Sequence, residues 1–160
     1  MEGLIQEHLE TTIKLALAMV FGCLIGYERA HSGKTAGMRT HALVSMGAAL
    51  FVIISTIVTE KYIGSTMFDP LRVASHIIVG VGFIGGGIIF LKDSRVSGLT
   101  TAAGLWVAAG IGTATGFGLY VLATIVTVLT LFIFIILGYL EFNPKRKAAQ
   151  KRKAAQKDKE

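Results

Sequence analysis

Four long apolar runs constrain the fold of this chain more than any other feature of its sequence. They cover about residues 11–27, 40–59, 73–91 and 118–140. Since a helix of about 20 residues crosses the hydrocarbon core of a bilayer, each run is close to membrane-spanning length. A fifth run, at about residues 99–116, is apolar but rich in Gly, Ala and Thr. The sequence therefore predicts an all-α, polytopic membrane helix bundle with about five transmembrane helices.

The composition leaves little room for anything beside these helices. Only 16% of the 160 residues are charged and 52% are hydrophobic, whereas about a quarter of the residues in an ordinary soluble domain are charged. We therefore expect one transmembrane domain at residues 1–142 and a disordered basic cytoplasmic tail at residues 143–160. The tail repeats KRKAAQ, and it is either a solvated orientation signal or an arm for anionic lipid, nucleic acid or an acidic partner. The orientation signal is the simpler interpretation, and with it we expect no nucleic-acid partner.

The Lys and Arg residues predict the orientation in the membrane. If the N-terminus lies outside, the cytoplasmic segments hold thirteen of the 16 Lys and Arg residues, and the outer segments hold the other three. Positively charged residues concentrate in the cytoplasmic loops of membrane proteins. The sequence thus predicts an N-out, C-in arrangement, which agrees with an odd number of spans.

Small residues recur every fourth position in three of the spans. Such rows let membrane helices approach one another closely, so we expect the spans at 11–27, 73–91 and 99–116 to form the core, with 40–59 as a fourth wall. The span at 118–140 has few small residues and is expected to face lipid. The glycines predicted to pack helices together are Gly22, Gly26, Gly80, Gly82, Gly85, Gly86, Gly87 and Gly104.

Two nucleotide-binding motifs are only partly present. The tripeptide GKT at residues 33–35 resembles the end of a P-loop, but that motif needs a glycine where this chain has Glu28. Residues 80–85 spell G-x-G-x-x-G, but no acidic residue follows about 20 positions later, as a dinucleotide site requires. The glycine-rich run is expected to be a tightly packed helix, or a broken helix whose free carbonyl groups coordinate a cation.

Ionisable residues within or beside a membrane are costly and indicate function, and this chain has two sets of them. One set surrounds the cytoplasmic ends of the first four spans, and the other places Asp69, Arg72 and His76 on one helical face. The functional hypothesis is a polar path that binds an ion, a proton or a partner. The structural alternatives are a helix cap at Asp69 with an ion pair to Arg72, and an interfacial pair between Glu28 and Arg39. The first set consists of Glu28, Arg29, Lys34, Arg39, His41 and Arg95.

Catalysis has little support in the sequence, and we expect that the protein is not an enzyme. The single Cys23 offers no disulfide or paired-cysteine site, and the four His residues lack the spacing of a metal site. Asp69 is the best single candidate for a Mg²⁺ ligand on the outer side. One carboxylate does not make a site for an ion that prefers octahedral oxygen coordination, so no cofactor is predicted.

Three blocks of sequence closely resemble the MgtC/SapB family of bacterial membrane proteins. They are GCLIGYERAHSGKTAGMRTHALVSMGAALF, DPLRVASHIIVGVGFIGGGIIF and VSGLTTAAGLWVAAGIG. The resemblance implies a multi-pass protein of the bacterial cytoplasmic membrane that is linked to magnesium homeostasis, growth at low magnesium and, in pathogens, virulence through survival in macrophages. It also implies a regulatory or binding role toward other membrane proteins, such as ATP synthase. The alternative is a Mg²⁺ or proton-coupled transporter or channel that uses an intramembrane polar site.

The signature motifs of the family match residues that the charge pattern of the sequence also singles out. Its Glu-Arg pair matches Glu28 and Arg29, its K-x-A-G-x-R-T-H motif matches residues 34–41, and its Asp-Pro-x-Arg motif matches residues 69–72. Two positions depart from the family pattern, because His76 stands where Gln is usual and Ser97 stands where a basic residue is common. From the glycine-lined faces and the small number of spans we also predict a homo-oligomer, most simply a dimer.

Overall fold

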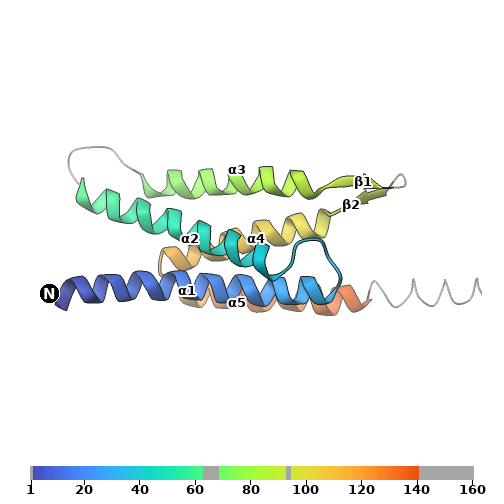
Figure 1. The fold of residues 1–160 in the computed structure, drawn as a ribbon, viewed down its shortest axis with the longest axis horizontal. Helices are drawn as coiled ribbons and strands as arrows, with labels where there is room; N and C mark the ends of the chain where they lie inside the picture. The colour runs from blue at the N-terminus through green and yellow to red at the C-terminus, as the bar shows by residue number, and fades with distance from the viewer. Residues whose placement is uncertain (1, 63–68, 93–94, 141–160) are drawn as a thin grey trace, which may run out of the picture.

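The computed structural model describes residues 2–62, 69–92 and 95–140. Within them, five helices run along one common direction and form a single bundle (Figure 1). In chain order the elements are α1 Glu2–His31, α2 Met38–Lys61, α3 Pro70–Ile88, β1 Phe90–Lys92, β2 Arg95–Ser97, α4 Leu99–Gly116, α5 Tyr120–Phe132 and the π-helical segment η1 Ile133–Leu137, which continues α5. The prediction of a helix bundle is confirmed.

Local sequence signals set where two of the helices begin and end. Gly33 follows α1 with a φ of 66°, a left-handed conformation that glycine adopts without steric cost. Its N–H donates to the Ala30 carbonyl at 3.0 Å, so the tripeptide GKT belongs to the end of a helix. Asp69 caps α3, as predicted, because its carboxylate accepts a hydrogen bond from the Leu71 N–H at 2.9 Å. Pro70 takes the first helical position, where no N–H donor is needed.

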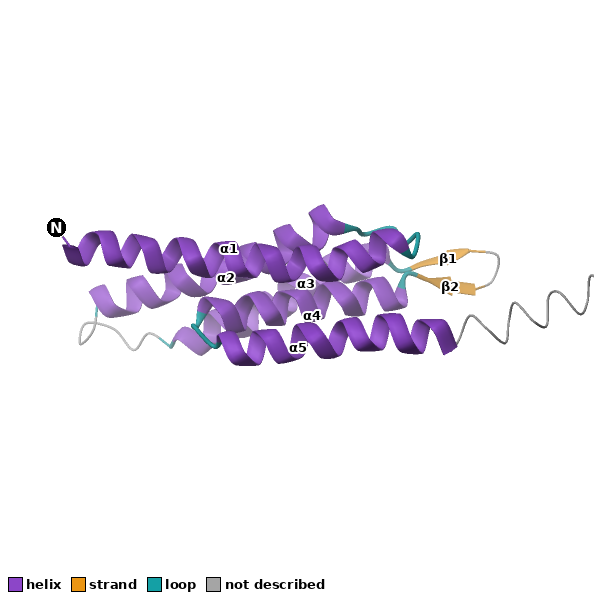
Figure 2. Ribbon diagram, turned by 90° about the horizontal axis from the view of Figure 1, so that it is seen from below, coloured by secondary structure: helices purple, strands orange, loops and turns teal. Residues whose placement is uncertain are grey.

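The connections sort into two ends of the bundle. The turn at residues 32–37, the antiparallel β1–β2 hairpin and the end of α5 lie at one end, which we call the basic end (Figures 1 and 2). The N-terminus of α1 and the turn at residues 117–119 lie at the other end. The basic connections that the sequence assigns to the cytoplasm therefore share one end of the molecule. Which side of the membrane this end faces stays a prediction.

Helices α2 and α4 form the centre of the bundle, and glycine lets their backbones touch. Both helices carry a row of buried small and branched residues, such as Ala49 and Val52 on α2 and Ala108 on α4. A Cβ atom added to Gly112 of α4 would overlap the carbonyl group of Ser45, and one added to Gly116 would lie 2.8 Å from the Cβ of Val52. The interface therefore has no room for a methyl group at either glycine.

Helix α1 joins this centre through its own glycines. A Cβ atom on Gly22 would lie 2.8 Å from the Cα of Ala42, and one on Gly26 would lie 2.8 Å from the backbone nitrogen of Met38. Both contacts are with the first turns of α2. Small residues on α1 therefore bring the start of α2 against α1 at the basic end.

The prediction made the span at 73–91 part of the core and the span at 40–59 a fourth wall beside it, and the structure corrects both positions. Helix α2, within the second of these spans, is central, whereas α3 packs through one narrow side that includes the buried Val81 and Gly85. The physical reason is that Ala and Ser rows on α2 allow the same close approach as glycine rows. The many glycines of α3 led to the wrong prediction that this helix is central.

Four of the helices in the described residues are long and apolar enough to cross a membrane: α1, α2, α3 and α5 with its η1 continuation. Helix α4 is not among these four, because its 18 residues are rich in Gly, Ala and Thr. It lies in the bundle beside them, and its buried side faces other helices rather than lipid (Figure 2). The chain is therefore a multi-pass membrane protein.

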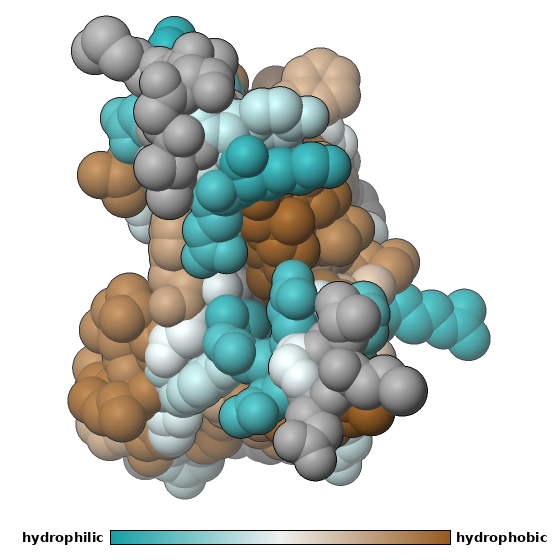
Figure 3. All heavy atoms as spheres, turned by 90° about the vertical axis from the view of Figure 1, so that its left-hand side faces the viewer, coloured by the Kyte–Doolittle hydropathy of each residue, from teal (hydrophilic) through white to brown (hydrophobic). Residues whose placement is uncertain are grey.

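The flanks and ends of the molecule differ in the way a membrane requires. Viewed from the end that holds the N-terminus of α1, hydrophilic side chains lie over much of that end, with hydrophobic side chains between and around them (Figure 3). On α5, which was expected to face lipid, Val121 is 75% exposed and Val128 is 60% exposed. The predicted tail at residues 143–160 lies outside the described residues, so the predicted domain boundary stays a prediction.

The sequence did not predict the β1–β2 hairpin, in which Phe90 pairs with Ser97 and Lys92 with Arg95. Helix α3 runs without a break through its glycine-rich part as far as Ile88. Residues 80–85 thus belong to a continuous helix, as the packed-helix alternative predicts. The broken-helix alternative is wrong on this point.

Candidate functional site

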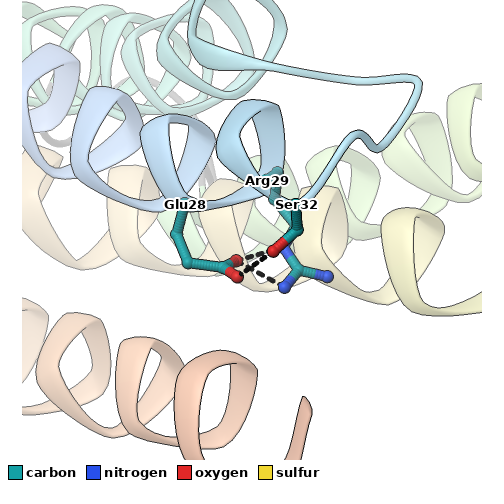
Figure 4. A network of polar contacts seen from close by, with 3 residues as sticks. All are labelled: Glu28, Arg29 and Ser32. Carbon is teal, nitrogen blue, oxygen red and sulfur yellow. Dashed lines mark hydrogen bonds and ion pairs between the residues drawn. The ribbon is translucent and has the colours of Figure 1, made fainter. Parts of the chain in front are cut away.

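Three polar side chains meet on the last turns of α1, at the basic end. The guanidinium of Arg29 donates to the carboxylate of Glu28 and forms an ion pair with it. The hydroxyl of Ser32 donates to the other carboxylate oxygen at 2.7 Å (Figure 4). The side chains of Arg29 and Glu28 are only 4% and 12% exposed. Both charges are thus largely withdrawn from solvent and compensate each other, as a buried ion pair requires.

His41 adds a fourth polar group from the first turn of α2. Its side chain is fully buried, and its Nδ1 lies 3.0 Å from the carbonyl oxygen of Gly37. Because a carbonyl oxygen only accepts, Nδ1 carries the proton in this contact. The other ring nitrogen, Nε2, has no hydrogen-bond partner within the described residues. It faces α4, where a Cβ atom added to Gly104 would lie 3.3 Å away.

Phe134 of η1 contacts Arg29 and lies beside Gly104, the glycine that His41 Nε2 faces. Its ring centroid lies 3.7 Å from the guanidinium carbon of Arg29, a cation–π contact. A Cβ atom on Gly104 would lie 3.1 Å from the edge of the same ring. We call Glu28, Arg29, Ser32 and His41 the polar cluster. Four helical segments thus converge on it: α1 and α2 supply the cluster, α4 supplies a glycine beside it and η1 supplies the ring.

The polar cluster keeps its two charges and the imidazole of His41 largely buried, whereas Ser32 lies at its exposed edge. Its fixed charges cancel, since one carboxylate faces one guanidinium. Arg29 also has an aromatic face against it, which stabilises a desolvated cation. Among the buried side-chain atoms of the described cluster residues, His41 Nε2 has no hydrogen-bond partner. The arrangement suits recognition or conformational control more than proton abstraction or nucleophilic attack, which need a reactive group exposed to a substrate.

The structure separates the remaining members of the first predicted set from the polar cluster. Lys34 lies exposed in the turn between α1 and α2, and Arg39 lies exposed on the first turn of α2. The expected pair between Glu28 and Arg39 is wrong, because Glu28 pairs with the adjacent Arg29. Arg95 begins β2 at the same end of the bundle, and its side chain lies outside the described part of the structure.

Asp69, Arg72 and His76 lie on α3 and its cap, and the beginning of α3 is at the opposite end from the polar cluster (Figure 1). All three side chains are exposed. The described residues contain two ion pairs, Glu10–Lys14 and Glu28–Arg29, so Asp69 and Arg72 are not paired with each other. The described residues also contain no group of three His, Cys, Asp or Glu side chains that could hold a metal ion. A role of Asp69 in binding Mg²⁺ stays a prediction.

The glycines that were predicted to pack helices fall into two groups. Gly22, Gly26 and Gly104 contact other helices as described above, and Gly85 faces the Ala102 side chain, with 3.4 Å between its would-be Cβ and the Ala102 Cβ. The other four would meet nothing within 4 Å in the described part of this chain: Gly80, Gly82, Gly86 and Gly87. A packing role for these four stays a prediction, and it requires a second molecule.

Sequence reasoning did not identify Ser32 or Phe134 as part of a site. Ser32 follows Glu28 by four residues, a spacing at which helical side chains meet, so its contact was predictable. Phe134 lies on the same face of its helical segment as Ala123, Thr127 and Thr130, which are buried. That row of small and hydroxyl side chains indicates an inward face in a span that otherwise resembles a lipid-facing helix.

Comparison with known proteins places the chain among bacterial membrane proteins. Residues 15–142 match the model of the MgtC family. The chain is 41% identical over 143 residues to the "Putative magnesium transporter YhiD" of Escherichia coli (strain K12), with 86% of this chain and 65% of the relative covered. It is 45% identical over 93 residues to "Protein MgtC" of Brucella abortus (strain 2308), with 58% of this chain and 37% of the relative covered. The chain thus spans less than two thirds of either relative. No solved structure matches it.

Proposed function

This chain belongs to the MgtC family, and from that premise we propose that it acts in the bacterial cytoplasmic membrane as a regulatory or binding protein of magnesium homeostasis. The names of two relatives, "Protein MgtC" and "Putative magnesium transporter YhiD", support the link to magnesium. The proposal gives the polar cluster the central role. It includes no enzymatic step.

One observation supports a regulatory role over transport most strongly: the polar cluster leads into a closed interface. Immediately beyond His41 along α2, the backbone of Ser45 touches Gly112 of α4 with no room for a methyl group. The next turns hold apolar side chains such as Ala49 and Val52, both fully buried. Two cavities, of about 280 and 340 Å³, lie instead between α3 and α4, the first extending to α5, and their linings are almost entirely apolar. A hydrated ion gains nothing from such surfaces.

The transport alternative relies on Asp69, Arg72 and His76. These residues are exposed on α3, whereas the buried side of this helix is apolar at Val81. A path within one chain would need them on the inner side, where polar residues of transporters usually lie. We therefore keep transport as the alternative and give the polar cluster the functional role.

Growth at low magnesium tests the proposal in cells. A bacterial strain without its own MgtC-family genes would express the full chain, the variant Ser32→Ala, the variant Arg29→Gln, or the exposed control Lys34→Gln. We expect the full chain and Lys34→Gln to support growth at low magnesium and both cluster variants to do so less well at equal amounts in the membrane. Equal growth with an empty vector, or full activity of both cluster variants, would contradict the proposal.

We also propose that the basic end faces the cytoplasm. The shared position of the turn at 32–37, the hairpin and the end of α5 supports this orientation, since the Lys and Arg residues then follow the positive-inside rule. Reporter fusions after residue 62 and after residue 140 test it. We expect an outside-active reporter to work at the first site and a cytoplasm-active reporter at the second.

A further inference from the structure

One face of α3 combines exposed ionisable groups with exposed small residues. The members recur every three or four residues, so they share one side of the helix. We call this face the outer stripe of α3. It consists of Asp69, Arg72, His76, Gly80, Phe83 and Gly87.

The outer stripe points away from the rest of the chain. The opposite side of α3 holds Val81, which packs against Ala48 and Ala109. On the outer stripe, in contrast, Phe83 is 87% exposed, and a Cβ atom on Gly80 or Gly87 would meet nothing within 4 Å. The described part of one chain therefore leaves the stripe uncovered.

Lipid alone is a poor cover for this surface. Arg72 and His76 lie within the apolar span Leu71–Ile88, and polar side chains in membrane helices almost always face other protein or water. Exposed glycines in such a helix lose van der Waals contact with lipid and gain it when another helix backbone approaches. Both the polar and the small residues of the stripe thus point to a second helix.

The charges of the stripe identify that helix. Asp69 and Arg72 are three residues apart, about 4.5 Å along the helix axis, and an arginine side chain spans that distance. When two copies of α3 lie parallel about a twofold axis, each residue lies level with its own copy, and the long side chain of Arg72 reaches diagonally to Asp69 of the partner subunit. Within one chain the carboxylate of Asp69 accepts only the Leu71 N–H at 2.9 Å among the described residues, which leaves carboxylate capacity for this pair. The same axis places His76 opposite its own copy, so that one ring can donate to the other.

We propose that the outer stripe of α3 is a self-complementary interface between two copies of this chain. Reciprocal Asp69–Arg72 pairs fix the register, and Gly80 and Gly87 receive the side chain of Phe83 from the partner subunit. The interface is isologous, since each copy offers the same residues to the other. The inference does not depend on the proposed function, because it concerns assembly and is read out without magnesium.

Disulfide cross-linking in native membranes tests the interface. The chain has one cysteine, so Cys23→Ser gives a background in which a single new cysteine reports contact. We expect Phe83→Cys to form a disulfide-linked dimer of this chain under mild oxidation. The control Val128→Cys, which is also exposed, at 60%, on a lipid-facing helix, should give none. Equal cross-linking at both positions, absence of a dimer at Phe83→Cys, or a product containing a different protein would overturn the proposal.

A charge exchange tests the pairing itself. In the Phe83→Cys background, Arg72→Asp places like charges opposite each other, and we expect about a tenfold or greater loss of cross-linked dimer. Asp69→Lys should lose it in the same way, with a small further loss from the missing helix cap. When the two variants carry different tags and are co-expressed, a mixed dimer should return, because each acidic stripe then faces a basic one. A homodimer unaffected by Arg72→Asp, or no recovery in the mixture, would overturn the pairing.

Discussion

The polar cluster and the outer stripe of α3 both place ionisable residues in apolar helices. They differ in whether the same chain supplies the partners that stabilise those residues. In the polar cluster, Arg29 is 3% exposed, and the carboxylate and the aromatic ring that stabilise it come from the same chain. On the outer stripe, Arg72 and His76 are exposed and the chain supplies no such partners among its described residues. The cluster is complete within one molecule, whereas we propose that a second molecule completes the stripe.

The glycines of α4 and α3 repeat this difference. Gly112 of α4 lies against the backbone of Ser45, whereas Gly87 of α3 meets nothing in the same chain. The two helices are both rich in glycine, with five in α3 and four in α4, and they differ in what surrounds them. Substitutions in the polar cluster and on α4 should therefore lower the stability of the chain more than substitutions on the outer stripe of α3.

The largest difference is expected between the two arginines. Arg29→Met leaves the Glu28 carboxylate, 12% exposed, without its partner, and breaking a buried ion pair costs about 3–5 kcal/mol of unfolding free energy. Arg72→Met on the outer stripe should change the stability of the detergent-solubilised monomer by only about 0.5 kcal/mol. Thermal unfolding in mild detergent, followed by circular dichroism, measures both. Equal losses for the two variants would mean that Arg29 is not buried as described.

A comparable contrast is expected between two glycines. Gly112→Leu inserts a side chain into backbone contact with Ser45, and overpacking of this kind costs about 3 kcal/mol. Gly87→Leu has open space in one chain, so the monomer should unfold as the wild type does. Size-exclusion chromatography of the solubilised variants gives the folded fraction. A well-folded Gly112→Leu protein would show that α2 and α4 are farther apart.

A smaller effect is expected at the aromatic cover of the cluster. Phe134→Leu keeps an apolar side chain but removes the ring 3.7 Å from the Arg29 guanidinium, and a desolvated cation–π contact is worth about 2 kcal/mol. Phe132→Leu, two residues earlier and 55% exposed, is the matched control. The unfolding midpoint of Phe134→Leu should fall and that of the control should not. The reverse order would show that the ring of Phe134 does not stabilise the polar cluster.

The smallest effect is expected at the cap of α3. Asp69→Ala removes the acceptor for the Leu71 N–H and should cost about 1 kcal/mol, whereas Asp69→Asn keeps a capping side chain and should cost far less. Because Asn lacks the charge, the same variant should still lose the cross-linked dimer in membranes. Comparison of unfolding and cross-linking for Asp69→Asn thus separates the cap from the interface. Retention of the dimer would assign Asp69 to the cap alone.

The sequence predicted the helices well because apolar runs and caps are local signals. The span at 99–116 coincides with α4 at Leu99–Gly116, and the cap at Asp69 was predicted from the Asp-Pro pair. It predicted the arrangement of the helices less well. Glycine rows indicate that a helix can pack closely, but they do not say whether the neighbour is in the same chain, as for Gly112, or absent from it, as for Gly87.

The candidate site was predicted in its members but not in its grouping. Glu28, Arg29 and His41 stood out as ionisable groups in apolar surroundings, and they do come together. Lys34 and Arg39 stood out equally, yet they are exposed, Lys34 in the turn at residues 32–37 and Arg39 on the first turn of α2. Phe134 was not predicted, since its contact with Arg29 depends on how the last helix folds back across the bundle.

Magnesium flux into liposomes tests most directly whether the polar cluster closes the bundle rather than opening into a path. Purified full-length chain would be reconstituted in one orientation around a Mg²⁺ dye, beside empty liposomes and the variants Arg29→Gln and Asp69→Ala. The account predicts that folded wild type admits Mg²⁺ no faster than empty liposomes. Flux through wild type that Arg29→Gln or Asp69→Ala abolishes would contradict it and make the protein a transporter.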